Sequence, residues 1–165
     1  MQEKTWYAIY TKSRAEKKVK ELMEERGYEV YLPLIKTLRQ WTDRKKMVEV
    51  PLISSYIFVC VSELEYYDIL NTPGAVAYVT FEGKAAPIRG SQIETMRKAV
   101  DGKQNITLVN ELLSKGQKVK IVSGPLKGSE GEYIETKHKC NFVINLSHIG
   151  FSLFVEVNAE NVIKL

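Results

Sequence analysis

Hydrophobic side chains fill six consecutive positions, Tyr56–Val61, directly after a proline-containing stretch that ends in two serines. β-Branched and aromatic residues dominate this run, which predicts a β-strand. Alternation along a strand gives it two apolar faces, with Tyr56, Phe58 and Cys60 on one and Ile57, Val59 and Val61 on the other. A strand with one face in water alternates apolar and polar residues, so this strand is expected to be covered on both faces.

The pattern around this strand predicts two strand–helix–strand units in the first hundred residues. Strands are expected at residues 6–10, 28–32, 56–61 and 75–80, helices at 13–27, 62–70 and 91–100, and a hairpin from Thr37–Trp41 and Lys46–Val50. Each helix begins with the Ser-x-x-Glu spacing of a capping box. This order predicts an α+β, ferredoxin-like domain with its helices on one face of an antiparallel sheet. The other apolar face is left to the last helix, to the C-terminal module or to a partner.

The pattern changes after residue 102. Residues 103–115 are polar and mixed, and predict a linker. Beyond them the pattern predicts five short strands separated by glycine-containing turns, at residues 119–122, 132–136, 142–146, 153–157 and 162–163. Strands so short and so closely spaced predict a small β-barrel over residues 116–165.

Charge is unevenly distributed along the chain, which has a net charge of +4. Residues 1–50 hold 12 Lys and Arg against 8 Asp and Glu, whereas the remainder holds 12 of each. A polyanion is therefore expected to bind the first fifty residues. The candidate positions are Lys12, Arg14 and Lys18 at the first helix, and Lys36, Arg39, Trp41, Arg44, Lys45 and Lys46 in the hairpin.

Two interpretations of these cations stay open. Lysines and arginines can neutralise phosphates while Trp41 stacks on an exposed base. Alternatively, the helix cations form a solvated face, and the hairpin is a lysine-rich edge protected against aggregation.

Catalysis and metal binding are not expected. The two histidines, His138 and His148, fall in the small β module, and His138-x-Cys140 lacks the further ligands of a metal site. No nucleophile elbow, phosphate-binding loop or zinc-protease motif occurs. Cys60 and Cys140 have no CxxC partner, which is typical of a reducing cytoplasm. No run is long enough for a membrane span, and the polar, charged Met1–Trp6 is unlike a signal peptide.

Taken in order, these segments resemble the NusG family of transcription elongation factors, which have an N-terminal NGN domain, a linker and a KOW barrel. The resemblance lies in Trp6-Tyr7, the helix from Ser13, the run Pro51 to Val59, the turn Asn71 to Ala75, and Gly116 to Gly128 followed by Gly131. It implies an NGN domain at residues 1–102, a linker at 103–115 and a KOW domain at 116–165. The run Leu38 to Lys46 is most similar to specialised paralogs of the RfaH and UpxY sort, which act as antiterminators on particular operons.

The resemblance also implies sites. The open apolar face would dock on the clamp helices of RNA polymerase through Tyr56, with Ile53, Phe58 and Phe81 beside it. Asn71 and Thr72 would contact the other side of the polymerase cleft, although Leu70 stands where the related motif begins with histidine. Lys12 and Lys18 match positions that contact the non-template strand, whereas Ser13 replaces an arginine there. Ile149 and Phe151 would contact ribosomal protein S10, and in some members Rho, or would simply be barrel core.

The implied protein is a monomer without cofactor that suppresses pausing or termination by holding one polymerase conformation. Its other expected ligand is non-template DNA or nascent RNA. Two alternatives remain: a housekeeping elongation factor of the same family, and a ribosomal or RNA-binding protein of the KOW type.

Overall fold

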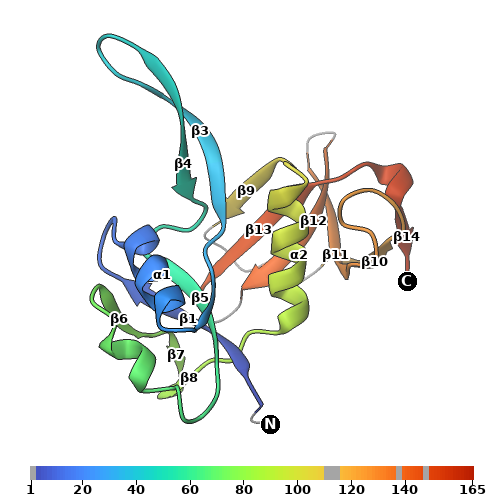
Figure 1. Cartoon of the computed structure of the whole chain (residues 1–165). Coiled ribbons are helices and arrows are strands. Elements are labelled where there is room, and N and C mark those ends of the chain that lie inside the picture. The colour runs from blue at the N-terminus through green and yellow to red at the C-terminus, as the bar shows by residue number, and fades with distance from the viewer. Residues whose placement is uncertain (1–2, 110–115, 137–138, 147–148) are drawn as a thin grey trace. The chain divides into compact units, whose positions relative to one another are not determined.

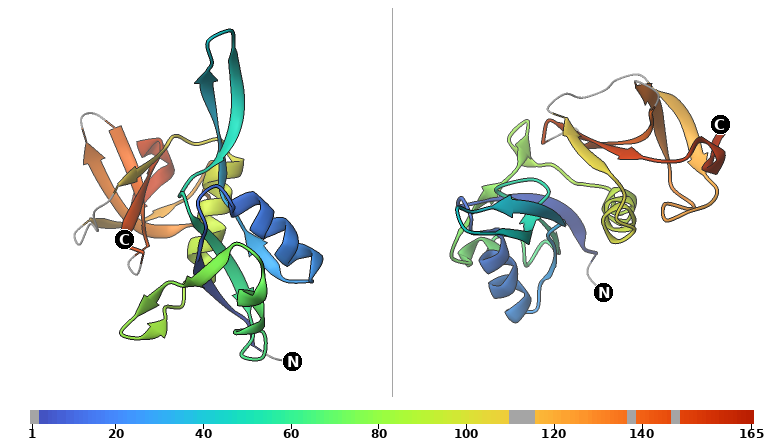
Figure 2. Two further views of the ribbon diagram at one scale, coloured as in Figure 1. Left: turned by 90° about the vertical axis from the view of Figure 1, so that its left-hand side faces the viewer. Right: turned by 90° about the horizontal axis from the view of Figure 1, so that it is seen from above.

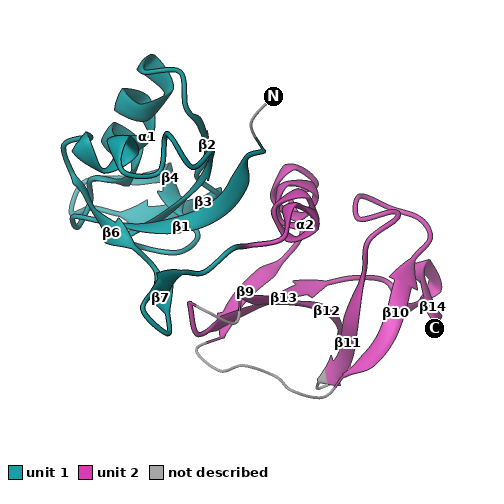
Figure 3. Cartoon of the chain, turned by 90° about the horizontal axis from the view of Figure 1, so that it is seen from below, with its two compact units in different colours: residues 1–87 teal, residues 88–165 magenta. Residues whose placement is uncertain are grey.

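The computed structural model describes residues 3–109, 116–136, 139–146 and 149–165 of the chain. These residues form two compact units, residues 1–87 and residues 88–165, which Figure 3 shows in teal and magenta. Both units combine antiparallel sheet with helix, so the α+β class expected from the sequence is confirmed.

A four-stranded antiparallel sheet forms the centre of the first unit (Figure 1). Its strands are β1 (Thr5–Thr11), β2 (Glu29–Tyr31), β5 (Tyr56–Val61) and β6 (Ala75–Tyr78), in the order β2-β5-β1-β6. The helix α1 (Glu16–Glu25) connects β1 to β2, and the short 3-10 helix η1 (Asp68–Asn71) precedes β6. This order, with every neighbouring pair antiparallel, is the ferredoxin-like arrangement predicted from the sequence.

Helix α1 covers one face of this sheet because its apolar side chains recur at helical spacing. Val19 and Met23 are buried, and they pack with Ile57, Val59 and Val61 in one hydrophobic cluster. The cluster also includes Ile9 from β1, Val30 from β2 and Tyr78 from β6, so it spans all four strands of the sheet. We call the opposite side of the sheet the outer face.

Two hairpins extend from the first unit. Strands β3 (Leu34–Gln40) and β4 (Lys45–Pro51) pair only with each other, and Figures 1 and 2 show them projecting from the rest of the unit. Strands β7 (Thr80–Phe81) and β8 (Lys84–Ala85) form a second, much shorter hairpin. The first hairpin was predicted from the sequence and runs further at its base than expected.

The second unit is a six-stranded antiparallel sheet that curves into a small barrel (Figure 2). Its strands, in the order β14-β10-β11-β12-β13-β9, are β9 (Ile106–Val109), β10 (Gln117–Ile121), β11 (Glu130–Thr136), β12 (Lys139–Leu146), β13 (Phe151–Glu156) and β14 (Val162–Lys164). A short 3-10 helix, η2 (Ala159–Asn161), precedes the last strand. Five of these strands match the prediction. Strand β9 does not, because it lies in the segment expected to be a linker and pairs with β13.

Helix α2 (Gly90–Asp101) also belongs to the second unit. Its Gln92 side chain donates a hydrogen bond to the carbonyl oxygen of Asn145 at 2.8 Å, and its Lys98 ammonium donates one to the carbonyl oxygen of Lys127 at 3.1 Å. The compact units therefore divide before this helix, whereas the sequence placed the domain limit at residue 102.

Two of the three expected capping boxes are wrong. At α1 the N-cap residue is Ala15 without a side-chain cap, and Glu16 instead accepts the backbone N–H of Ser55 at 2.9 Å. Helix α2 begins at Gly90, before the Ser-x-x-Glu spacing, and also has no side-chain cap. Ser62 and Glu65 do form the reciprocal pair of hydrogen bonds, although a turn and η1 follow rather than the expected α-helix.

Candidate functional site

The outer face of the first unit's sheet is largely aromatic. Side chains directly opposite one another on neighbouring strands share a face, and Tyr10 stands opposite Tyr56, Ala8 opposite Phe58 and Tyr31 opposite Phe58. The outer face therefore includes Trp6, Ala8, Tyr10, Tyr31, Tyr56, Phe58 and Cys60, with Glu29 opposite Cys60 and Ala77 opposite Tyr10. This grouping places Tyr56 and Phe58 together, as the sequence predicted.

Two residues expected to lie open on this face are buried. Phe58 is 0% exposed and Ile53 is 2% exposed, and the Phe58 ring stacks on Tyr31 with centroids 6.4 Å apart. The expectation of an open face is therefore wrong at Phe58 and Ile53. A fully buried side chain cannot touch a partner unless its neighbours move, so neither residue is available for direct contact in this structure.

Tyr56 is half-buried, and beside it lies a residue that the sequence analysis did not select. Tyr10 is 38% exposed, and its ring centroid is 4.9 Å from that of Tyr56. Burial and a hydrogen bond with Tyr10 raise the pKa of Tyr56 to about 12, so the Tyr56 hydroxyl stays protonated at neutral pH. Tyr10 could have been selected from the sequence, because Trp6, Ala8 and Tyr10 alternate along the first predicted strand.

Phe81 and Asn71 are exposed, but they lie outside the aromatic sheet. Phe81 is 55% exposed on β7, which pairs only with β8. Asn71 is exposed at the end of η1, whereas Thr72 is 2% exposed. The Thr72 hydroxyl donates to the carbonyl oxygen of Ile69 at 2.8 Å and accepts a hydrogen bond from Arg26 at 2.9 Å. The expectation of a contact by Thr72 is wrong, because both hydrogen bonds hold this side chain inside the unit.

The cations at the start of α1 are exposed, as expected. Lys12 and Arg14 lie in the turn before the helix, and Arg14 has a φ of 62°, which is uncommon for a residue with a side chain. Lys18 lies 3.6 Å from Glu21, an exposed pair with little effect on stability. Lys17 donates to the carbonyl oxygen of Glu49 at 2.7 Å, which connects α1 to the base of the β3–β4 hairpin.

The β3–β4 hairpin has two different faces. Cross-strand partners Arg39 and Lys46 share one face, and alternation adds Trp41 and Arg44 at the tip. Arg44 lies over the Trp41 ring, with its guanidinium carbon 5.6 Å from the ring centroid. We call this group the cationic face.

The opposite side of the hairpin is mixed. It carries the exposed pair Leu38 and Met47, which are 57% and 55% exposed, together with Lys36 and Lys45. The hairpin residues expected to bind nucleic acid are therefore divided, with Lys36 and Lys45 on the mixed face and Arg39, Trp41, Arg44 and Lys46 on the cationic face. Exposure of Trp41, at 43%, fits a ring available for stacking.

In the barrel, Ile149 and Phe151 are both half-buried. Ile149 lies in the turn after β12, where its N–H donates to the carbonyl oxygen of Leu146 at 3.0 Å, and Phe151 opens β13 opposite the same leucine. The barrel core is formed by other residues, such as Phe142, Leu153 and Val155, each at most 2% exposed. This placement leaves part of each expected contact residue on the surface.

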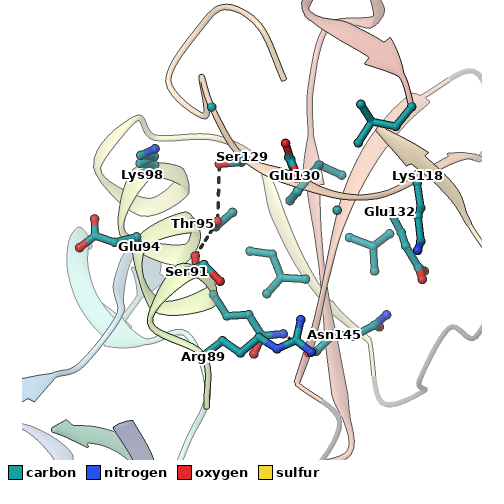
Figure 4. Close-up of a pocket in the computed structure, with 17 residues that line it drawn as sticks. Arg89, Ser91, Glu94, Thr95, Lys98, Lys118, Ser129, Glu130, Glu132 and Asn145 are labelled. Atoms are coloured by element: carbon teal, nitrogen blue, oxygen red, sulfur yellow. Dashed lines mark hydrogen bonds between the residues drawn. The ribbon is translucent and has the colours of Figure 1, made fainter. Parts of the chain in front are cut away.

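A cavity of about 650 Å³ lies between α2 and the barrel within the second unit (Figure 4). Its lining contains three cations, Arg89, Lys98 and Lys118, and three carboxylates, Glu94, Glu130 and Glu132. Figure 4 shows the Thr95 hydroxyl bridging Ser91 and Ser129 across one side of it. Three cations balanced by three carboxylates do not favour a phosphate, so we assign this cavity to the packing of α2.

Within the described ranges, no three or more His, Cys, Asp or Glu side chains gather in a group that could hold a metal ion. His138 and His148 lie outside the described residues. Neither of the two α-helices among the described residues has the length and apolar character needed to cross a membrane.

The chain is similar in sequence to known proteins over nearly its whole length. The family model described as NusG, transcription termination factor nusG, matches residues 4–97. The transcription termination/antitermination protein NusG of Bacillus subtilis (strain 168) is 26% identical over 180 residues, covering 99% of this chain and 99% of that protein. The protein of the same name from Staphylococcus aureus (strain Mu50 / ATCC 700699) is 26% identical over 177 residues, covering 98% and 96%.

A solved structure described as "Domain interaction in Thermotoga maritima NusG" aligns over 99% of this chain and 98% of its own, with 20% identity and a TM-score of 0.49. The family assignment does not depend on this similarity, because the family model alone covers more than half of the chain. Members of this family are transcription factors and not enzymes. The chain belongs to the NusG family of transcription termination and antitermination factors.

Proposed function

We propose that this protein binds RNA polymerase during elongation and changes its pausing and termination. The observation that carries the proposal is the family match over residues 4–97, which contains the whole aromatic outer face. The partner would be the clamp helices of the polymerase, contacted through the half-buried Tyr56 and the exposed Tyr10. Phe58, which is buried next to Tyr56 on the same face of the sheet, would help to hold the Tyr56 ring in place, and Asn71 and Phe81 would make separate, peripheral contacts.

The mechanism proposed is preferential binding and involves no covalent step. A factor that binds one polymerase conformation more tightly than another shifts the population toward it by the difference in binding free energy. Holding the clamp closed would disfavour the paused conformation. A tenfold difference in affinity, about 1.4 kcal/mol, is enough to change pause lifetimes measurably.

We favour a general elongation factor over a specialised one. The relatives described above are NusG proteins matched over nearly their whole length, which supports the general role. A specialised role on particular operons, such as that of RfaH- or UpxY-type paralogs, is the second candidate. Its support is the projecting hairpin, whose cationic face holds Arg39, Trp41, Arg44 and Lys46.

The remaining partners follow from the same proposal. The cationic face and the exposed Lys12, Arg14 and Lys18 would contact non-template DNA or nascent RNA, since they supply the positive charge that phosphates require. The barrel would contact ribosomal protein S10 through Ile149 and Phe151, and Rho is the second candidate partner for these residues. The protein would act in the cytoplasm as a monomer.

A pausing assay with purified RNA polymerase tests the proposal. We expect the protein to shorten pauses and to change readthrough at terminators on unrelated templates. An effect restricted to one operon's template would favour the specialised role. Tight binding of structured RNA without any effect on polymerase would contradict the proposal and favour an RNA-binding protein.

The contact surface is tested separately with Tyr56→Ala. Removal of this ring is expected to weaken polymerase binding about tenfold or more, because truncated aromatic anchors at interfaces commonly cost over 1 kcal/mol. Val76→Ala is the matched control, since Val76 is 57% exposed on β6 of the same unit. Equal binding by both variants would show that the outer face is not the docking surface.

A further inference from the structure

The first unit also contains a cavity, which lies apart from the outer face. Its volume is about 470 Å³, and it is lined by residues that include Glu3, Tyr7, Val61, Glu63, Tyr66 and Tyr67. Tyr7 stands opposite Val59, a residue of the helix-covered core, so the cavity does not open on the Tyr10–Tyr56 side of the sheet. We call this cavity the tyrosine pocket.

Stacked rings fix the wall of the tyrosine pocket. The ring of Tyr66 lies parallel to that of the buried Tyr78, with centroids 4.2 Å apart and an interplanar angle of 8°. Tyr7 meets both rings edge-on, at 5.8 Å and 5.5 Å. The Tyr78 hydroxyl donates to the carbonyl oxygen of Tyr66 at 2.6 Å, which holds the two residues together. A ring held in this way presents a preformed surface to a ligand.

The rim of the pocket carries exposed apolar side chains. Leu64 and Tyr67 are 77% and 78% exposed, higher than any other large apolar side chain among the described residues. Tyr67 lies edge-on against Tyr66, with centroids 4.9 Å apart. Large apolar groups left in water next to a cavity are typical of an interaction site.

The charge of the pocket is negative, in contrast with the net charge of the chain. Glu3 and Glu63 line it, and its lining contains no lysine or arginine among the described residues. Two nearby carboxylates already have partners: Glu65 lies 3.5 Å from Lys4, and Asp68 lies 2.6 Å from Arg26. The salt-bridge pairs in the described part of the chain include neither Glu3 nor Glu63, so both can take a cation from outside.

We propose that the tyrosine pocket binds an arginine side chain presented by a basic, partly apolar segment of a protein partner. A guanidinium stacks on a tyrosine face through cation–π attraction and pairs with a carboxylate in the same plane, which an ammonium does less well. The Tyr66 and Tyr67 rings supply the aromatic surface, Glu63 the carboxylate, and Leu64 a contact for an apolar neighbour of the arginine. A nucleic acid is disfavoured, because its phosphates would meet Glu3 and Glu63.

An NMR titration of the full-length protein tests this proposal. The probe is an acetylated and amidated pentapeptide of sequence Gly-Arg-Leu-Arg-Gly, followed through the backbone amide signals. We expect saturable shifts at Glu63, Leu64 and Tyr67, with a dissociation constant of about 1 mM, as is typical of a small and exposed contact. The same peptide with citrulline in place of arginine keeps the shape without the charge and should bind at least about fivefold more weakly.

Two exposed substitutions locate the site. Glu63→Lys and Tyr67→Ala are each expected to weaken binding of the arginine peptide about fivefold, while the amide spectrum shows that the fold is kept. Glu25→Lys makes the same charge change at an exposed position of α1 and should leave binding unchanged. Equal affinity for the citrulline peptide, equal losses in the three variants, or shifts centred on Tyr10 and Tyr56 would each overturn the proposal.

Discussion

Asp68 is the side chain on which the contacts around η1 converge. It accepts hydrogen bonds from the Tyr28 hydroxyl and, at 2.6 Å, from the Arg26 guanidinium. The second nitrogen of the same guanidinium donates to Thr72 at 2.9 Å. Arg26 therefore ties the end of α1 to both sides of the turn that exposes Asn71. Asn71 is presented outward because its neighbours are held inward.

This cluster predicts a dependence of stability on pH. The hydrogen bond from Tyr28, followed by the charge of Arg26, lowers the pKa of Asp68 below its ordinary 3.8. When the pKa of a carboxyl group is lower in the folded chain than in the unfolded chain, its ionised form stabilises the fold. This stabilisation is fully present at pH values above the pKa of the unfolded chain, and it is lost as the pH falls through the pKa of the folded chain. Tyr28→Phe should thus lower the melting temperature at pH about 7, and its effect should become smaller as the pH falls below the ordinary pKa of 3.8.

Tyr67→Phe is the control for that experiment, because it removes the hydroxyl of an exposed tyrosine that makes none of the hydrogen bonds to Asp68 described above. Melting curves of the parent and both variants at several pH values provide the measurement. The same loss of stability at every pH would show that Tyr28 acts through packing alone.

Gly74 allows a second prediction at the residue scale. Its φ is +93°, and an added Cβ would lie 2.7 Å from Cγ2 of the buried Val19. Gly83 has a similar φ of +82° but nothing within 4 Å. Both Gly→Ala variants should cost about 1 kcal/mol for the backbone, and Gly74→Ala about 1–3 kcal/mol more for the clash. Urea unfolding measures both, and equal losses would contradict the close packing of Gly74 on α1.

The two faces of the β3–β4 hairpin can be compared with double variants that change the net charge of the protein by the same amount. Arg39→Glu with Lys46→Glu reverses two charges on the cationic face, whereas Lys36→Glu with Lys45→Glu reverses two on the mixed face. The first pair should weaken binding to an elongation complex with an exposed non-template strand about tenfold more than the second, and reduce its salt dependence more. Equal losses in fluorescence anisotropy titrations would mean that the hairpin acts only through its net charge.

The sequence predicted the elements whose patterns are local and regular. The uninterrupted apolar run Tyr56–Val61, the helical spacing in α1 and the two arms of the hairpin were all sufficient. The capping boxes failed where a distant backbone group competed, since Glu16 is drawn away from its own helix by the N–H of Ser55. Strand β9 was missed because its pairing partner, β13, lies over forty residues away and no local pattern records it.

The residues of the candidate site were likewise predicted where local patterns determine them and missed where distant contacts do. The positions of Tyr56 and of the exposed cations follow from alternation and charge, and both were predicted. Burial of Phe58, Ile53 and Thr72 was not predicted, because it depends on which side chains from elsewhere in the fold come to lie over them. Tyr10 could be predicted only in part. Its place on the outer face follows from alternation along β1, but its position opposite Tyr56 depends on the register of β1 and β5.

At the scale of the whole molecule, helix α2 decides where one unit ends and the other begins. The family match extends to residue 97, inside this helix, whereas the compact units divide before it. Within the second unit the helix is held by Gln92 and Lys98, and Gly102 at its end approaches Pro125 so closely that a Cβ would lie 2.5 Å from the proline ring. These contacts tie both ends of the helix to the barrel.

Two fragments test this division. If α2 is part of the second unit, residues 88–165 should melt about 5 °C higher than residues 103–165, since about 1 kcal/mol shifts the midpoint of so small a domain by about 4–8 °C. The longer fragment should also show helical circular dichroism that disappears in the same transition, because an isolated helix of this length is marginal in water. Gln92→Ala in the longer fragment should lower its midpoint, whereas Glu94→Ala, at an exposed position of the same helix, should leave it nearly unchanged. Identical melting of the two fragments would show that the barrel folds without α2 and would support the limit at residue 102.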